Sequence, residues 1–312
     1  METPGKVLIA APVHNVLLQG LADRGYECVV REKISQQEAF GLIADCVGVI
    51  TSTRLQLDKA LLDAAPLLRW IGRMGSGMEV IDVPYAMARG IKCVSSPEGN
   101  SNAVGEHAMG MLLSLIRRIG WSHREMMDGQ WLREENRGSE LEGKTIGIIG
   151  LGHTGRSFAR KLQAFDMRIL AYDKYKGHDV PAYIEPCADL TAIFRDADII
   201  SFHVPLQEDT RHYFNHDFLR QMQRPFVLVN TSRGPVVDTL ALADGIAQRR
   251  ILGACLDVFE EEPVNKLDAQ RKKILDDLAA TPQLVITPHI AGYTAEALFK
   301  MSRTLYQKLF VE

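Results

Sequence analysis

Long apolar runs are missing from this sequence. No stretch of the chain approaches the roughly 20 consecutive apolar residues that a membrane-spanning helix requires. The apolar run near the N-terminus, Val7–Ala11, is too short for the hydrophobic region of a secretory signal, and Pro12 follows it. We therefore interpret this run as the first strand of a folded domain.

Cysteine is scarce and forms no recognisable motif. The five cysteines lie apart in apolar surroundings and include no C-x-x-C pair: Cys28, Cys46, Cys93, Cys187 and Cys255. This arrangement argues against a zinc site or a thioredoxin-like centre, and an odd number without a framework is typical of reduced thiols in the cytosol. We expect a cytoplasmic protein that binds no metal.

Charge of one sign is not in excess either. The 312 residues carry a formal net charge of -3, which gives no reason to expect nucleic acid or an anionic membrane as a partner. Hydrophobic residues make up 46% and charged residues 24%, as in an ordinary globular protein. A chain of this length has room for two domains.

The first third of the chain alternates short apolar segments with amphipathic ones. We expect strands at Val7–Ala11, Glu27–Val30, Val47–Thr51, Arg69–Ile71 and Lys92–Val94, with helices near Leu17–Arg24, Gln36–Ala44, Asp58–Ala64 and Tyr85–Arg89. Strands that alternate with helices predict βαβ units and a parallel sheet. The glycine turn Arg73–Gly77 follows one of these strands, and its backbone N–H groups are candidates for binding a small anion.

A second glycine turn marks the start of another α/β segment. Ile146–Ile149 has the composition of a buried strand, and Gly150, Gly152 and Gly155 then form G-x-G-x-x-G before the helical pattern Arg156–Phe165. Strand, glycine turn and helix in this order are the context of a dinucleotide-binding site. In such a site the glycines admit the pyrophosphate and the helix N-terminus faces it.

An acidic residue indicates which dinucleotide is bound. Asp173 ends the next expected strand, Met167–Tyr172, about 20 residues after the glycine turn, where a ribose-binding carboxylate is expected. A carboxylate accepts hydrogen bonds from ribose hydroxyls and repels a 2′-phosphate, so NAD is favoured over NADP. Lys174 and Lys176 lie nearby and keep NADP open as an alternative.

The remaining elements follow the same rhythm. Between the two α/β segments we expect one long helix, Ser101–Met127, followed by a loop or arm, Asp128–Gly143. Further strands are expected at Asp198–Phe202, Phe226–Asn230, Ile251–Leu256 and Leu284–Thr287, with helices at Asn215–Met222, Thr239–Gln248 and Ala295–Phe310.

Reactive side chains follow the last three expected strands. Arg233, Asp257 and His289 each come shortly after one of them, and the acidic run Glu260–Glu262 lies beside Asp257. Ligands of open α/β sheets bind beyond the carboxyl ends of the strands. Each residue alone is explained by a surface or structural role, but their coincidence favours a catalytic site. A methyltransferase shares the glycine turn and the acid, yet gives no reason for Arg233, Glu262 and His289 together.

Several sequence blocks, in their order and spacing, resemble the D-isomer-specific 2-hydroxyacid dehydrogenases over nearly the whole chain. The blocks are Arg73–Asp82, Val104–His107, Gly150–Gly155, His203–Leu206, Asn230–Gly234, Leu256–Pro263 and Thr287–Gly292. The resemblance implies an α/β protein of two doubly wound parallel-sheet domains. These are a flavodoxin-like substrate domain, 1–99 plus 293–312, and a Rossmann NAD-binding domain, 100–292. It also implies an NAD-dependent enzyme acting on 2-keto and D-2-hydroxy acids, and a homodimer formed through the helix and arm of the NAD-binding domain.

The same resemblance assigns roles to individual residues. It implies that His289 is the acid and base, that Glu262 supports it and that Arg233 binds the substrate. The implied cofactor contacts are Gly150, Gly152, His153, Thr154, Gly155, Asp173, His203, Pro205, Thr210, Ser232, Asp257 and Gly292. Arg73, Ser76 and Gly77 are the implied substrate contacts, the last two through their backbone.

The departures from the family pattern fall mainly in the first domain and the segment that joins the domains. Met78–Asp82 lacks the family's Asp-Asn pair, Ser95–Asn100 differs from the usual Asn-x-Pro-Gly pattern, and Gly105 replaces a common alanine. These differences leave the identity of the 2-hydroxy acid open. The C-terminal-binding-protein corepressors share the fold and the catalytic blocks, so an NAD-sensing binding protein is the alternative to an enzyme.

Overall fold

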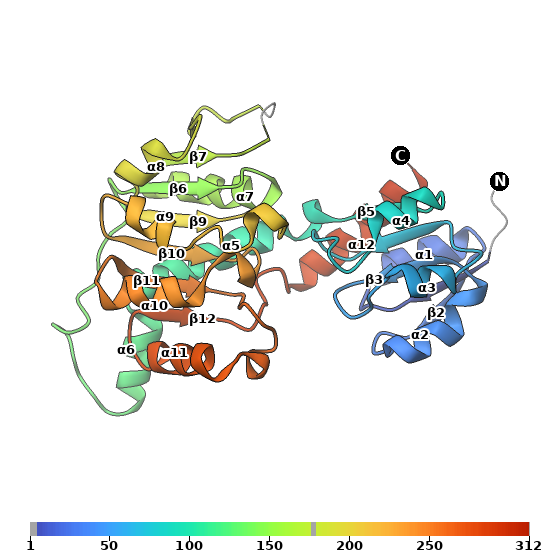
Figure 1. The fold of residues 1–312 in the computed structure, drawn as a ribbon, viewed down its shortest axis with the longest axis horizontal. Helices are drawn as coiled ribbons and strands as arrows, with labels where there is room; N and C mark the ends of the chain where they lie inside the picture. The colour runs from blue at the N-terminus through green and yellow to red at the C-terminus, as the bar shows by residue number, and fades with distance from the viewer. Residues whose placement is uncertain (1–4, 176–178, 312) are drawn as a thin grey trace. The chain divides into compact units, whose positions relative to one another are not determined.

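Two compact units make up the chain in the computed structural model, which describes residues 5–175 and 179–311. The first unit comprises Met1–Ser101 and Tyr293–Glu312, and the second comprises Asn102–Gly292. Each unit has a parallel sheet with helices on both of its faces (Figure 1). Within the described residues, no helix has both the length and the apolar character that crossing a membrane requires.

The described residues of the first unit form a five-stranded parallel sheet in the order β2-β1-β3-β4-β5. The strands are β1 (Lys6–Ile9), β2 (Glu27–Val30), β3 (Cys46–Thr51), β4 (Trp70–Arg73) and β5 (Lys92–Ser95). Helices α1 (Asn15–Asp23) and α12 (Ala295–Phe310) pack on one face; α2 (Gln36–Leu42), α3 (Lys59–Asp63) and α4 (Val83–Ala88) pack on the other. This strand order is the flavodoxin-like order, which confirms the predicted fold.

The second unit contains a seven-stranded parallel sheet in the order β12-β11-β10-β9-β6-β7-β8. The strands are β6 (Thr145–Ile149), β7 (Arg168–Tyr172), β8 (Glu185–Pro186), β9 (Ile199–Phe202), β10 (Phe226–Asn230), β11 (Ile251–Leu256) and β12 (Leu284–Ile286). From β6 the chain adds β7 and β8 on one side of the sheet and then β9 to β12 on the other. This switch point, between β6 and β9, is where dinucleotides bind in Rossmann folds. The predicted Rossmann architecture is therefore confirmed.

Helices cover both faces of this second sheet. Helices α5 (Pro97–Ile116) and α7 (His153–Leu162) pack on one face; α8 (Thr191–Asp196), α9 (His216–Gln221), α10 (Thr239–Ala247) and α11 (Ala269–Ala279) pack on the other. Short 3₁₀ turns occur at Ile43–Asp45, Gln163–Phe165, Glu208–Thr210, Gly234–Val236 and Val264–Lys266. The sequence did not predict α8 or β8, because each buries too few apolar side chains to give a periodic pattern.

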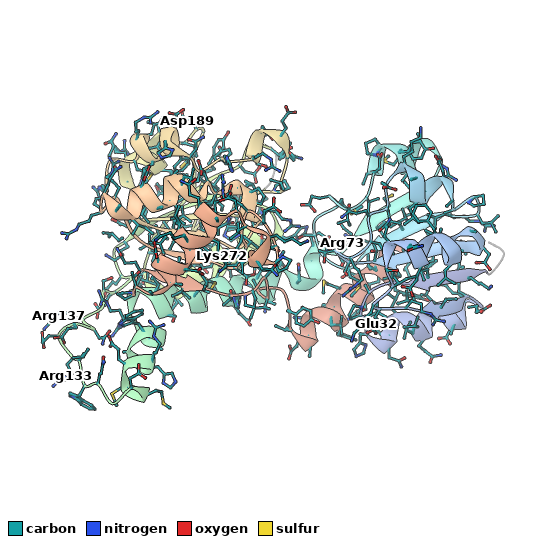
Figure 2. The ribbon with its side chains drawn as sticks, turned by 60° about the horizontal axis from the view of Figure 1, so that its bottom comes forward. Glu32, Arg73, Arg133, Arg137, Asp189 and Lys272 are labelled. Carbon is teal, nitrogen blue, oxygen red and sulfur yellow. The ribbon has the colours of Figure 1, made fainter. Side chains whose placement is uncertain are left out.

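The prediction of one continuous helix over Ser101–Met127 is wrong. The chain forms α5 and then α6 (Ile119–Met127), because Arg118 adopts the left-handed conformation with φ 55° and cannot continue a right-handed helix. The arm that follows, residues 128–143, contains neither helix nor strand among its described residues. It extends away from the rest of the second unit, with Arg133 and Arg137 on it (Figure 2).

Candidate active site

Strand β6 and helix α7 meet in the predicted glycine turn. Gly150 has φ +95°, a conformation that favours glycine, and a Cβ there would lie 2.6 Å from the carbonyl oxygen of His203. A Cβ on Gly155 would lie 2.1 Å from the carbonyl oxygen of Gly150. The turn therefore packs this closely only with glycine at these two positions.

Gly152, in contrast, faces open space. Among the described residues, no heavy atom outside its immediate surroundings lies within 4 Å of the position that its Cβ would occupy, and no side chain caps α7 there. Helix α7 begins at His153 and Thr154, so its first backbone N–H groups lie at this end of the helix. Together with the positive end of the helix dipole, they fit an anionic diphosphate.

Asp173 is held beside this turn. Its Oδ2 accepts a hydrogen bond from the backbone N–H of Leu151 at 2.6 Å, and its Oδ1 accepts one from Tyr175 at 2.8 Å. Each carboxylate oxygen has a second lone pair, so both can still accept from ribose hydroxyls. Lys174 forms an ion pair with Asp209. Lys176, the other lysine considered from the sequence, lies outside the described residues.

Two predicted cofactor contacts direct their side chains into the protein. The His203 ring packs on Phe158 of α7, and its Nε2 lies 2.9 Å from Ser201 Oγ. Burial lowers the pKa of His203 to about 4, so its imidazole is neutral at physiological pH. The Thr210 hydroxyl donates to the carbonyl oxygen of Pro205 at 2.6 Å. These side chains fix the shape of the loop after β9.

The loop after β10 is fixed by Asn230, whose side chain is fully buried. Its Oδ1 accepts hydrogen bonds from the backbone N–H and the hydroxyl of Ser232, and its Nδ2 donates to the carbonyl oxygen of Arg233 at 2.9 Å. A Cβ on Gly234 would lie 1.6 Å from the carbonyl oxygen of Phe259. The loop that carries Arg233 thus rests directly on the backbone of the loop after β11.

His289 and Glu262 form a hydrogen-bonded pair. His289 Nδ1 lies 2.6 Å from Glu262 Oε2, and the backbone N–H of Phe259 donates to Glu262 Oε1 at 3.0 Å. Burial raises the pKa of Glu262, but these hydrogen bonds and the positive charge of Arg233 outweigh it and hold that pKa below its ordinary value. The Glu262 carboxylate is therefore ionised at neutral pH. Within the described residues, Nε2 of His289 has no hydrogen-bond partner.

Glu260, another glutamate of the acidic run, has a structural role. Glu260 lies beside His212, with 2.7 Å between Oε1 and Nε2, and accepts from Arg271 Nε at 2.9 Å and from the N–H of Thr239 at 3.1 Å. These contacts tie its loop to the start of α10 and to α11. Of the two, only Glu262 contacts His289, the pairing that the family resemblance implied.

The first unit contains the other predicted glycine turn. Gly75 has φ +126°, and a Cβ there would lie 1.7 Å from Nη1 of Arg73, whose side chain is buried beneath the turn. The N–H of Gly75 donates to Ser96 Oγ at 3.0 Å, which fixes the turn. Ser76 is exposed and Gly77 partly exposed, so the turn presents backbone to solvent at the end of β4.

Sequence reasoning assigned no role to three polar residues that shape the site. Asn230 ends β10, Thr287 follows β12, and His107 lies on α5 with its Nε2 2.9 Å from Thr287 Oγ1. The rule that selected Arg233 and His289 from their positions after strands also points to Asn230 and Thr287. No local signal in the sequence pairs His107 with a residue 180 positions later.

Comparisons with known proteins agree with this geometry. The D-isomer specific 2-hydroxyacid dehydrogenase family, NAD binding domain, matches residues 109–291. The chain is 34% identical to the hydroxypyruvate reductase of Thermotoga maritima over 309 residues, which is 98% of each protein. It is 37% identical to the glyoxylate reductase of Thermofilum pendens over 281 residues, covering 88% of this chain and 80% of the relative.

A solved structure shows the same architecture. The D-lactate dehydrogenase of Aquifex aeolicus, in complex with NAD and lactic acid, superimposes with a TM-score of 0.83 at 26% identity, over 97% of this chain and 95% of that one. The match to the NAD binding domain, residues 109–291, lies within the second unit. The chain belongs to the D-isomer-specific 2-hydroxyacid dehydrogenase family of nicotinamide-dependent oxidoreductases.

Proposed function

We propose that this protein reduces a 2-keto acid to a D-2-hydroxy acid, and catalyses the reverse oxidation, with His289, Glu262 and Arg233 as the catalytic residues. The observation that supports this most directly is the 2.6 Å contact between His289 Nδ1 and Glu262 Oε2, beside the loop that carries Arg233. Loops after three neighbouring strands, β10, β11 and β12, supply these three residues. This is the edge of the sheet where ligands of such folds bind.

His289 supplies the proton in the direction of reduction. When bound, the nicotinamide supplies a hydride to the carbonyl carbon, so negative charge develops on the carbonyl oxygen. An imidazolium at His289 donates to that oxygen from Nε2, since Nδ1 is bonded to Glu262. The ionised carboxylate of Glu262 favours the imidazolium and fixes the ring. In the oxidation direction the neutral ring accepts the proton from the hydroxyl.

Arg233 is the residue that we assign to the substrate carboxylate and carbonyl. A guanidinium offers a planar fork of donors that matches two oxygens at once. For the first unit we propose that the backbone of Ser76 and Gly77 binds the substrate carboxylate, with the buried charge of Arg73 beneath the turn favouring an anion there.

The cofactor that we propose is NAD rather than NADP. Asp173 places a fixed carboxylate next to the glycine turn, where it would repel a 2′-phosphate, and the charge of Lys174 is balanced by Asp209. Gly150, Gly152, His153, Thr154 and Gly155 would hold the diphosphate. The remaining proposed contacts come from loops at the same sheet edge: His203, Pro205, Thr210, Ser232, Asp257 and Gly292.

For the substrate we propose a small 2-keto acid of the hydroxypyruvate or glyoxylate type. The support is that the two relatives named above match this chain over most of their own lengths. Purified protein should be assayed with NADH against hydroxypyruvate, glyoxylate, pyruvate, phosphohydroxypyruvate and bulkier branched or aromatic keto acids. We expect turnover on at least one of the small acids. NADH binding without turnover on any of them, together with NADH-dependent capture of a peptide, would favour the corepressor-like alternative.

We also propose a homodimer formed through α6 and the arm. Met127 and Trp131 are 75% and 74% exposed, and Ile119 and Met126 are exposed on the same segment. Clustered apolar side chains at the surface are typical of protein contacts. Sedimentation should give a dimer, and Trp131→Asp should shift it towards monomer.

We also propose a cytoplasmic location. All five cysteines are free, which supports this proposal.

A further inference from the structure

Asp257 is bonded mainly to the segment that carries His289. Its side chain is fully buried. The carboxylate accepts hydrogen bonds from the N–H groups of Ile290 and Ala291, each at 2.9 Å, and its backbone carbonyl accepts from the N–H of His289 at 2.8 Å. Asp257, in the loop after β11, therefore binds three consecutive backbone N–H groups of the loop after β12.

This segment needs such support because of its backbone conformation. His289 has φ +55°, in the left-handed region that L-residues other than glycine rarely adopt. A residue in this region persists only where the surrounding structure fixes it. The bonds from Asp257 on either side of the His289 Cα supply that constraint, so they set the direction of the imidazole.

Thr287 and His107 complete the surroundings of the Asp257 carboxylate. Thr287 Oγ1 lies 2.5 Å from Asp257 Oδ1 and 2.9 Å from His107 Nε2. A hydroxyl has one proton, and a carboxylate has none to give, so the hydroxyl donates to Asp257 and accepts from an Nε2–H of His107. Met111 Sδ, at 3.7 Å, is a weaker acceptor for the same hydroxyl. His107 Nε2 also lies 3.6 Å from Asp257 Oδ1.

We propose that His107 and Thr287 are positioning residues that act on His289 through Asp257. Among the described residues, neither side chain bonds to the Glu262–His289 pair, and neither takes part in the proton transfer itself. The contact of Thr287 with His289 is through the backbone, where the Thr287 carbonyl accepts from the His289 N–H at 3.0 Å. Helix α5 is thereby connected to the catalytic loop by a chain of hydrogen bonds. The inference rests on the proposed function, because it assumes that His289 is the acid.

The consequence is a specific effect on turnover. Without the Thr287 hydroxyl, Asp257 loses one of its donors, and the loop gains freedom around the left-handed His289. Small displacements of a catalytic group reduce the chemical step strongly while leaving sites elsewhere intact. The glycine turn and Asp173 lie on other strands of the sheet, and of the proposed cofactor contacts only Asp257 and Gly292 lie near the change. NADH affinity should therefore fall much less than kcat.

The test uses matched variants of the full-length protein. Thr287→Val removes the hydroxyl at nearly constant shape, and Thr287→Ser keeps it. Likewise, His107→Leu removes the donor, whereas His107→Gln places an amide N–H near the position of Nε2. Thr281→Val, which removes a hydroxyl that bonds only locally at the end of α11, is the control. Each variant is measured for kcat with a keto acid, for NADH affinity by fluorescence and for thermal unfolding.

We expect Thr287→Val and His107→Leu to lower kcat about 10- to 100-fold and to lower NADH affinity much less. Thr287→Ser and His107→Gln should recover most of the lost kcat. Wild-type kcat in both the Val and the Leu variants would overturn the inference. Losses in Thr287→Ser as large as in Thr287→Val would overturn the role of the hydroxyl. If His289→Ala turns over as fast as the wild type, the proposed function is contradicted. This result distinguishes a failure of the proposed function from a failure of the inference about His107 and Thr287.

Discussion

The Nδ1 atom of His289 lies 2.6 Å from the Oε2 atom of Glu262. The carboxylate occupies Nδ1, so Nε2 is the nitrogen left for a substrate. His289 lies in the loop after β12 and Glu262 in the loop after β11. These two strands are paired in parallel, with Leu256 opposite Ile286. The register of the sheet therefore sets the distance between the two loops that form the pair.

Glu262→Gln keeps the size of the side chain but removes its charge. We expect kcat for keto-acid reduction to fall about 10- to 100-fold, because a neutral amide stabilises an imidazolium poorly. Steady-state NADH oxidation measures this directly. Glu261→Gln, a neighbour in the same exposed run, is the matched control, and equal losses in the two variants would argue against a special role for Glu262.

Arg233→Lys keeps the positive charge but replaces a planar fork with a point charge. We expect kcat/KM for the keto acid to fall by about tenfold or more, since an ammonium cannot bind two oxygens in parallel. NADH affinity, measured by fluorescence, serves as the internal control. A lysine variant with wild-type kcat/KM would mean that bidentate binding is not the function of Arg233.

Much of this site was predictable because parallel sheets place strand ends together. Arg233, Glu262 and His289 each follow a buried apolar strand, and the strands alone put them at one edge of the sheet. The contact between Glu262 and His289 was implied by resemblance to a family and not by any local pattern. Its distance depends on the register of two strands, which the sequence does not state.

Other features depended on contacts that leave no local signal. The helical pattern is broken at Arg118, which has a left-handed backbone conformation. The arm packs against the end of α5 next to this break, where the Ser139 N–H donates to the carbonyl oxygen of Ile116. Likewise, His107 reads as one polar residue of a long helix until the fold places it against Thr287. Both depend on tertiary packing, which overrides helix periodicity.

Cofactor choice should follow the charge of Asp173. We expect the wild type to prefer NADH, and Asp173→Ala to reduce the ratio of kcat/KM with NADH to that with NADPH by about tenfold, because the repulsion of a 2′-phosphate is lost. Asp189→Ala removes another surface carboxylate of the same unit (Figure 2) and should leave the ratio unchanged. A wild type that prefers NADPH would contradict this assignment.

Stability should depend on pH through His203. Its folded pKa of about 4 lies below the unfolded value of 6.5, so the unfolded state binds more protons between these values. The free energy of unfolding therefore falls as pH drops through this window, with a contribution of about 2 kcal/mol between pH 7 and pH 5. Chemical denaturation of wild type and His203→Gln should show a smaller pH dependence in the variant. The same dependence in both would show that His203 is not the group responsible.

The most direct test of the account compares NADH oxidation by wild type and His289→Asn, with hydroxypyruvate and glyoxylate as substrates. NADH affinity is measured in parallel by fluorescence titration. We predict that the wild type turns over at least one acid and that the variant loses about 100- to 10,000-fold in kcat while it binds NADH with wild-type affinity. Undiminished turnover by His289→Asn would contradict the central claim that His289 is the catalytic acid.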